Sequence, residues 1–241
     1  MSLSNSFDEI IHKRRSNRKF DPAVEVPNEV IQRSLERAIL SPNSSNMQLW
    51  EFYWIQDPAL QSQFHEFCLN QNAAKTAKQL VVFVTRQDHW KKRVRWHLDI
   101  INQDIQGEPT PAQQRLLNYY GKLMPMAYGS DPLGFLTFFR TALSSIIGAA
   151  RPMMRFRGKA DQRVTVHKSC ALAAQTFMLS IAAEGFDSCP MEGFDAKRVK
   201  AALNLPKEAE VNMIIGVGKG TEAGIWGKRH RVPFEEVVII K

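Results

Sequence analysis

The chain opens with two segments whose apolar residues recur every three or four positions, the period of an amphipathic helix. The first begins at a capping box, Ser6 to Glu9, and is predicted to end near Arg15. The second carries its apolar residues between positions 30 and 39 and ends at Ser41-Pro42, because the residue before a proline is disfavoured in a helix. A polar loop, 43–48, follows the second helix.

Strand-forming residues gather in short runs between the helical segments. The clearest run is Leu80–Thr85, a continuous apolar stretch typical of a buried strand. The predicted strands are Trp50–Ile55, Leu80–Thr85, a short strand around Ser188, Glu210–Val217 and Val237–Ile240. The chain therefore combines helices with a few strands, and we find no internal repeat.

The middle of the chain, at about 88–163, has helical spacing interrupted by turn residues and is predicted to be a helical insertion. Within it, Leu133–Ala150 is strongly apolar and precedes a basic run, Arg151–Lys159, a pattern that could lie on an anionic membrane surface. Arg140, two glycines and several hydroxyl residues make a poor membrane-spanning helix. We therefore favour a lid or a dimer-packing segment, with Met153, Met154 and Phe156 as packing residues.

A later segment, Val166–Glu184, is apolar on nearly all sides and is predicted to be a helix that ends at Gly185. A helix of this kind is buried on most of its faces, as at the centre of a large interface.

Composition fits one compact domain. The chain has 241 residues, of which 44% are hydrophobic and 10% aromatic, enough to bury a substantial core. Its three cysteines are odd in number and lack metal-ligand spacing, which predicts free thiols and no metal centre. The opening residues are polar and do not have the pattern of a secretory signal, so we expect a cytoplasmic protein.

The formal net charge of +8 could serve nucleic acid, a membrane surface or a small anionic ligand. No nucleic-acid-reading motif accompanies the basic clusters, so we do not expect nucleic-acid binding. The first cluster, Lys13–Lys19, and the last, Lys228–Arg231, both offer forked guanidinium groups suited to a phosphate. The two ends of the chain could close on one anion. The run Gly216-Val217-Gly218-Lys219-Gly220 lacks the spacing of a phosphate-binding loop and is interpreted as a turn after a strand.

Four segments resemble, in order and spacing, the signatures of FMN-dependent nitroreductases. They are Arg14–Phe20, Ser41–Phe52, Cys189–Phe194 and Arg229–Pro233, and together they span almost the whole chain. The resemblance implies an α+β fold, with a central, mostly antiparallel sheet flanked by helices, in an intertwined homodimer. It implies one domain over residues 1–241, and the helical insertion at about 88–163 is a segment to which the resemblance does not extend.

The resemblance also assigns cofactor contacts. Arg14, Ser16, Arg229 and Arg231 resemble the ligands of the FMN phosphate, and Arg15 would flank the ribityl chain or the phosphate. Arg18 would lie at the pyrimidine edge of the flavin, where a fixed cation stabilises the negative charge of the reduced ring. The other expected contacts are Gln71 at the pyrimidine edge, Pro42, Asn43, Ser44 and Asn46 from the partner subunit, and Pro190, Met191, Glu192 and Gly193 on the N5 side.

The implied activity is transfer of electrons from NADH or NADPH, through FMN, to a small electron-poor acceptor such as a nitroaromatic or a quinone. No side chain is expected to be catalytic, because the flavin carries the chemistry. Two alternatives stay open: a family member with another flavin redox task, such as a dehydrogenase or dehalogenase, and a non-catalytic flavin-binding protein. Membrane association is not favoured.

Overall fold

A four-stranded antiparallel sheet forms the centre of the computed structural model, which describes residues 2–129, 135–152 and 158–241. Its strands are β1 (Trp50–Ile55), β2 (Gln79–Thr85), β3 (Asp187–Met191) and β4 (Glu210–Gly218), in the spatial order β1-β2-β4-β3. Four of the five predicted strands are confirmed. The fifth is wrong, because α11 (Phe234–Val237) and an irregular tail occupy the C-terminal residues.

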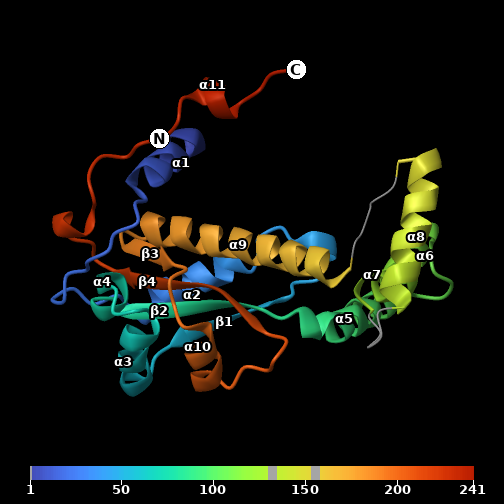
Figure 1. The fold of residues 1–241 in the computed structure, drawn as a ribbon, viewed down its shortest axis with the longest axis horizontal. Coiled ribbons are helices and arrows are strands. Elements are labelled where there is room, and N and C mark those ends of the chain that lie inside the picture. The colour runs from blue at the N-terminus through green and yellow to red at the C-terminus, as the bar shows by residue number, and fades with distance from the viewer. Residues whose placement is uncertain (1, 130–134, 153–157) are drawn as a thin grey trace.

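Helices cover both faces of the sheet, as expected for the predicted α+β class (Figure 1). Leu80, Val82 and Val84 of β2 pack in one core layer with α3 (Pro58–Phe67), α4 (Asn72–Lys75) and α10 (Ala196–Ala202). Val81 and Phe83 pack on the other face against α2 (Asn28–Ala38) and α9 (Lys159–Ala183). Alternate side chains of a strand point to opposite faces, so the fully apolar run of β2 serves both layers.

The first helix, α1 (Leu3–Lys13), begins earlier than predicted. Ser2 is its N-cap, and the Ser2 hydroxyl accepts a hydrogen bond from the Asn5 amide at 3.2 Å. The predicted capping box at Ser6 therefore lies inside the helix, since both serines are competent caps and only one can start it.

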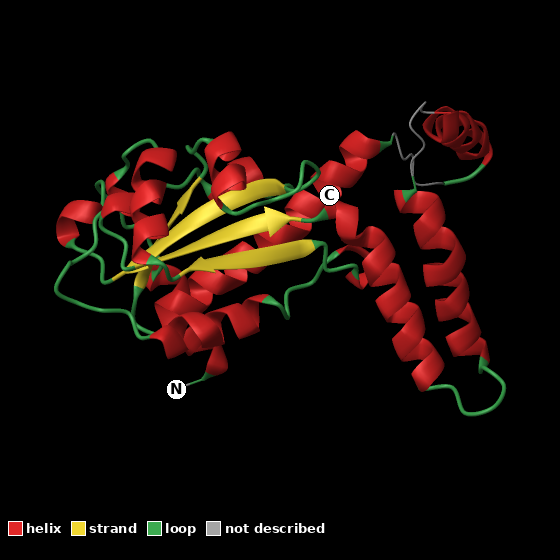
Figure 2. Cartoon of the chain, turned by 90° about the horizontal axis from the view of Figure 1, so that it is seen from below, coloured by secondary structure: helices red, strands yellow, loops and turns green. Residues whose placement is uncertain are grey.

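The predicted insertion folds as a series of helices that project from one end of the sheet (Figure 2). They are α5 (Trp90–Gln103), α6 (Pro111–Asn118), a π-helical turn (Tyr119–Leu123), α7 (Met124–Tyr128) and α8 (Phe135–Ala150). Two short 3-10 turns lie outside this series, at Ser44–Asn46 and Glu222–Gly224, and a third, Gln87–His89, leads into α5. A separate small core joins the insertion to Met47 and Leu49. Met153, Met154 and Phe156, together with Arg155 and Arg157, lie outside the described residues.

The long helix α9 confirms the predicted helix over Val166–Glu184 and starts seven residues before it. One side of α9 packs on the sheet and α2, while Val164 and Leu172 are exposed on the other. Gly185, at φ +87°, ends the helix in the left-handed region. Among the residues that the structure describes, no helix is long and apolar enough to span a membrane.

Candidate functional site

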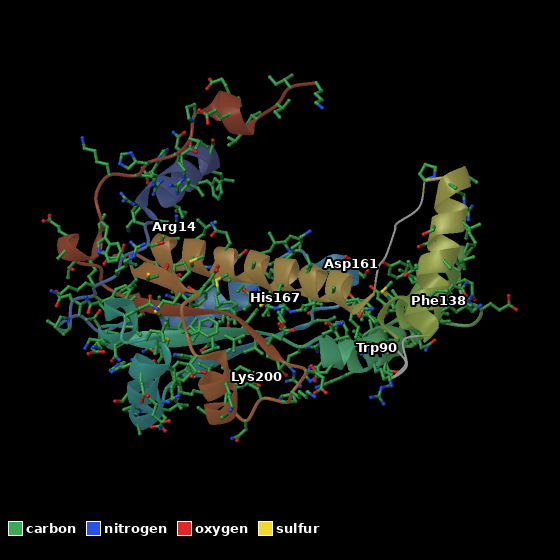
Figure 3. All side chains as sticks on the ribbon, in the orientation of Figure 1. Arg14, Trp90, Phe138, Asp161, His167 and Lys200 are labelled. Atoms are coloured by element: carbon green, nitrogen blue, oxygen red, sulfur yellow. The ribbon has the colours of Figure 1, made fainter. Side chains whose placement is uncertain are left out.

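The two basic ends of the chain meet, as the sequence suggested. A pocket of about 210 Å³ is lined by residues from both: Arg14, Arg15, Ser16, Arg18, Trp226, Lys228, Arg229, His230 and Arg231. No carboxylate is among these lining residues. Arg14 lies between α1 and the C-terminal end of α9 (Figure 3). We call this the basic pocket.

Asn17 joins the N-terminal basic segment to the C-terminal loop through hydrogen bonds, a role that the sequence did not predict. Its side chain is buried and donates to the Thr221 carbonyl at 2.9 Å, and its backbone N–H donates to the Ser188 carbonyl at 3.2 Å. Added Cβ atoms on Gly220 and Gly224 would come within 2.2 and 1.7 Å of the Asn17 side chain. These two glycines therefore let the C-terminal loop close onto the N-terminal basic segment.

The glycines at 216 and 218 belong to β4, so the predicted turn over Gly216–Gly220 begins too early. A Cβ on Gly216 would lie 2.7 Å from the Ala73 carbonyl oxygen, and one on Gly218 would lie 2.7 Å from the Phe20 ring. Both contacts are shorter than side chains tolerate, so these glycines serve close packing of the sheet.

Electrostatics of the basic pocket favour an anion. Burial lowers the pKa of Arg14 from its usual value, and the positive charges of Arg229, Arg231 and Arg15 lower it further. Like charges held together are mutually destabilising, so a bound dianion would relieve the repulsion. Next to the pocket, the side-chain hydroxyl of Ser188 is buried without a hydrogen-bond partner. The backbone of Ser188 in β3 pairs with that of Ser16, which lines the pocket.

The two C-terminal arginines differ in their contacts. Arg229 donates to the carbonyls of Ile11, His12 and Arg14 at 3.2, 3.0 and 2.6 Å. It therefore provides hydrogen-bond donors for backbone carbonyls at the C-terminal end of α1, which have no partner within the helix. Arg231 is exposed and donates to the carbonyl of its neighbour His230 at 2.7 Å. Both arginines were predicted to bind the phosphate. The guanidinium of Arg231 contacts one carbonyl and that of Arg229 contacts three, so Arg231 has more donors left for a ligand.

The other two arginines are also oriented by local contacts. Arg15 donates to the Gly227 carbonyl at 2.9 Å, which ties it to the C-terminal loop. The guanidinium of Arg18 lies 4.3 Å from the centre of the Trp226 ring, a cation–π contact.

Beside the basic pocket lies β3, which forms one edge of the sheet. The Ser188 carbonyl accepts from the Asn17 amide, so it points away from β4 and toward the free edge of the sheet. Backbone groups two residues apart in a strand point the same way, so the backbone of Pro190 also faces the free edge. A proline is tolerated there because its missing N–H faces the unpaired edge. Met191 is buried in the core, so its side chain is not free for a ligand.

After β3, Glu192 and Gly193 are exposed. Gln71 donates to the Gly193 carbonyl at 2.7 Å, so the structure brings this predicted contact to the end of β3.

The loop at 42–46 and the residues just after it have an unusual backbone. Ser45, Asn46 and Gln48 have φ values of +55°, +50° and +47°, a region that costs energy for residues other than glycine. Asn43 supports the loop by accepting from the Gln48 amide at 2.8 Å, and the Ser44 amide donates to the Ser169 hydroxyl of α9 at 3.2 Å. Pro42 is exposed at its start.

The insertion holds this loop in place. His97 lies with its Nε2 atom 2.8 Å from the Asn46 carbonyl oxygen, and Tyr120 donates to the Ser45 carbonyl at 3.1 Å. The hydroxyls of Ser45 and Tyr119 are 2.7 Å apart. Burial lowers the pKa of His97, so the ring is held neutral with Nε2–H as the donor.

Within one copy, the loop and the basic pocket lie apart. Ser169, which contacts the loop, and Ala183, the last residue of α9, are fourteen positions apart, which is about 21 Å at the rise of about 1.5 Å per residue. Arg14 of the basic pocket lies near that C-terminal end of α9 (Figure 3). The loop also precedes β1, whereas Ser188 belongs to β3 at the opposite edge of the sheet. The structure therefore assembles most of the predicted contacts at the basic pocket and at β3, but not those at 42–46.

Two further pockets adjoin the insertion. One, of about 230 Å³, lies between the loop and the helices around Tyr119. The other, of about 450 Å³, is larger and is lined by both acidic and basic side chains, among them Lys159, Arg163 and Glu210.

The three cysteines are free and buried, and burial raises the pKa of Cys68 and of Cys170 to about 12. In the described ranges, no three histidine, cysteine or acidic side chains gather as metal ligands would.

The nitroreductase family model matches residues 11–219 of the chain. A protein of Synechocystis named DrgA is 29% identical over 95% of this chain and 90% of its own length. An NADH dehydrogenase of Thermus thermophilus is 26% identical over 94% of this chain and 92% of its own length. A nitroreductase-like crystal structure from Exiguobacterium sibiricum, solved in complex with FMN, has a TM-score of 0.69 at 21% identity, covering 98% of this chain and 97% of that one.

Proposed function

Because this chain belongs to the nitroreductase family, we propose that it is an FMN-dependent oxidoreductase that takes electrons from NADH or NADPH. The acceptor would be a small electron-poor molecule such as a nitroaromatic or a quinone. The observation that carries the proposal is the basic pocket, where arginines from the two ends of the chain meet without a carboxylate. The FMN complex of the Exiguobacterium relative and the name of the Thermus relative support the cofactor and the electron donor.

The residues present fit the FMN phosphate. Arg14, Ser16 and Arg231 would bind it through two guanidinium groups and a hydroxyl, the donors that phosphate oxygens prefer. Arg229 would hold the Arg14 backbone in place through its hydrogen bond to the Arg14 carbonyl. Arg15, tied to Gly227, would lie beside the ribityl chain.

Bound FMN supplies the redox chemistry, accepting electrons from the nicotinamide and passing them to the acceptor. The chain's own task is orientation. Arg18 would place a fixed positive charge at the pyrimidine edge, joined there by Gln71. If the alternation of β3 continues, the backbone N–H of Glu192 faces the free edge of the sheet and can donate to the flavin.

We propose a homodimer in which the 42–46 loop reaches the cofactor of the second copy. The distance of this loop from the basic pocket of its own chain supports the proposal, since one copy alone leaves the site incomplete. Apolar residues are exposed on α9 and on the C-terminal tail: Val164, Leu172, Val232, Phe234, Val237, Val238, Ile239 and Ile240. A second copy would cover such a surface. The cytoplasm, where reduced nicotinamides are available, is the proposed compartment.

The test begins with the absorption spectrum of the purified protein, which should show oxidised flavin that acid releases as FMN. Anaerobic addition of NADH or NADPH should bleach the spectrum, and a quinone should restore it. Flavin that neither nucleotide bleaches would favour the non-catalytic alternative. Bleaching without reoxidation by quinones or nitroaromatics would favour a family member with another redox task.

A further inference from the structure

We propose that Trp226 is a positioning residue of the cofactor site: its indole ring holds the Arg18 guanidinium where that charge stabilises the reduced ring of FMN. Trp226 lies outside the four segments that carry the resemblance to nitroreductases, and beyond residues 11–219, which the family model matches. The inference rests on the proposed function, because it adds a residue to the site of the same cofactor.

The chain around Trp226 is fixed on both sides to the segment that carries Arg18. Before it, the Gly224 carbonyl accepts from the Arg18 backbone N–H at 2.8 Å. After it, the Gly227 carbonyl accepts from the Arg15 guanidinium at 2.9 Å. Gly227 has a φ of +74°, a region that favours glycine, so the chain can turn directly after Trp226. These contacts place the indole ring over Arg18.

The Trp226 ring is the closest described support of the Arg18 guanidinium. The guanidinium carbon lies 4.3 Å from the centre of the ring, and one nitrogen donates to the Ser16 carbonyl at 3.4 Å, which is long for a hydrogen bond. No carboxylate is among the residues lining the basic pocket, so none there competes for the guanidinium. An aromatic face attracts a cation through its quadrupole and carries no charge of its own. Trp226 therefore holds Arg18 without neutralising it.

The positive charge of Arg18 acts on β3, the strand beside which the flavin is expected. Burial raises the pKa of Cys189 in β3, and the charge of Arg18 opposes that rise. Trp226 itself is 74% exposed, so it adds little to the hydrophobic core. Its loss should therefore change the position of the Arg18 charge more than the stability of the fold.

The test compares Trp226→Leu, which removes the aromatic face, with Trp226→Phe, which keeps one. The purified holoprotein is reduced stepwise beside a reference dye, and the midpoint potential of the bound flavin is read from the absorption spectrum. The loss of one cation–π contact at an exposed site should weaken the binding of reduced FMN about two- to fivefold more than that of oxidised FMN. For a two-electron couple, this lowers the midpoint potential by about 9 to 21 mV. Trp226→Phe should have a potential closer to that of the unchanged protein.

Two controls separate the positioning of Arg18 from a disturbance of the loop. Ile225→Ala shortens the preceding side chain, which is not among those lining the basic pocket, and should leave the potential unchanged. In the Arg18→Gln background, Trp226→Leu should have no further effect on the potential, because the charge that Trp226 positions is then absent.

An unchanged or raised potential in Trp226→Leu would overturn the inference while the proposed function stands. An equal fall of the potential in Ile225→Ala, or in the Arg18→Gln background, would also overturn it, because the effect would then come from the loop. Purified protein that takes up no FMN would instead overturn the proposed function on which the inference rests.

Discussion

Replacing Arg229 and Arg231 one at a time separates two roles that look alike in the sequence. Arg231→Ala removes an exposed guanidinium whose described partner is the carbonyl of its own neighbour. The apo protein should keep its stability within about 0.5 kcal/mol, as for other surface substitutions. FMN binding should weaken by about 1.5 to 3 kcal/mol, the scale of a hydrogen bond to a charged group, which raises the Kd about 10- to 150-fold.

Arg229→Ala removes three hydrogen bonds to carbonyls at the end of α1, at 2.6 to 3.2 Å. Leaving these carbonyls without that donor should lower the free energy of unfolding of the apo protein by about 1.5 to 3 kcal/mol. For a chain of this size the melting temperature should fall by about 3 to 12 °C. FMN affinity should fall as well, because Arg14 loses the contact that positions it.

Thermal unfolding of the two apo variants and fluorescence titration with FMN measure both effects. Arg229→Lys is the matched control, since it keeps the charge but cannot contact three carbonyls with a planar fork. Equal melting temperatures for the apo Arg229→Ala and Arg231→Ala variants would refute the assigned difference. An unchanged FMN affinity in Arg231→Ala would refute the phosphate contact.

Three further predictions concern the anion site, the loop and the assembly. Inorganic phosphate at ten times its Kd should raise the free energy of unfolding of the apo protein by about 1.4 kcal/mol, and Arg14→Ala should abolish this in thermal unfolding. The pKa of His97 is lowered in the folded state, so the folded protein resists protonation of the ring. The contribution of His97 to the free energy of unfolding is therefore complete above about pH 6.5, the usual value of an exposed histidine, and is lost as the pH falls below it. His97→Gln should flatten that part of the stability profile, and an unchanged slope would contradict the role of His97. Sedimentation of dilute holoprotein should detect a dimer, and a flavin-loaded monomer would refute the shared site.

Segments with strong periodicity were predictable from the sequence, and those that depend on distant partners were not. The run Leu80–Val84 within β2 is apolar throughout and could only be buried, so its place in the sheet followed from composition. Val237–Ile240 has strand composition as well, yet it pairs with no strand, and a strand is stable only beside another.

The candidate site was predictable to a similar degree. The arginines at the two ends identified an anion site because phosphate chemistry needs such groups. In the sequence, an arginine that donates to backbone carbonyls looks the same as one whose guanidinium is free. The structural role of Arg229 could therefore not be predicted. Asn17 and Tyr119 were missed because their partners, Thr221 and Ser45, are distant in the sequence.

Mixed dimers test the central claim, an FMN site shared between two copies, most directly. One copy carries Arg14→Glu, which damages the basic pocket, and the other carries Ser44→Glu, which damages the exposed loop. Neither homodimer should retain FMN. A heterodimer purified through two tags should retain about one FMN and recover electron transfer from NADH or NADPH to menadione, because it contains one site with both halves intact. A heterodimer without FMN, or a Ser44→Glu homodimer that binds FMN normally, would contradict the account.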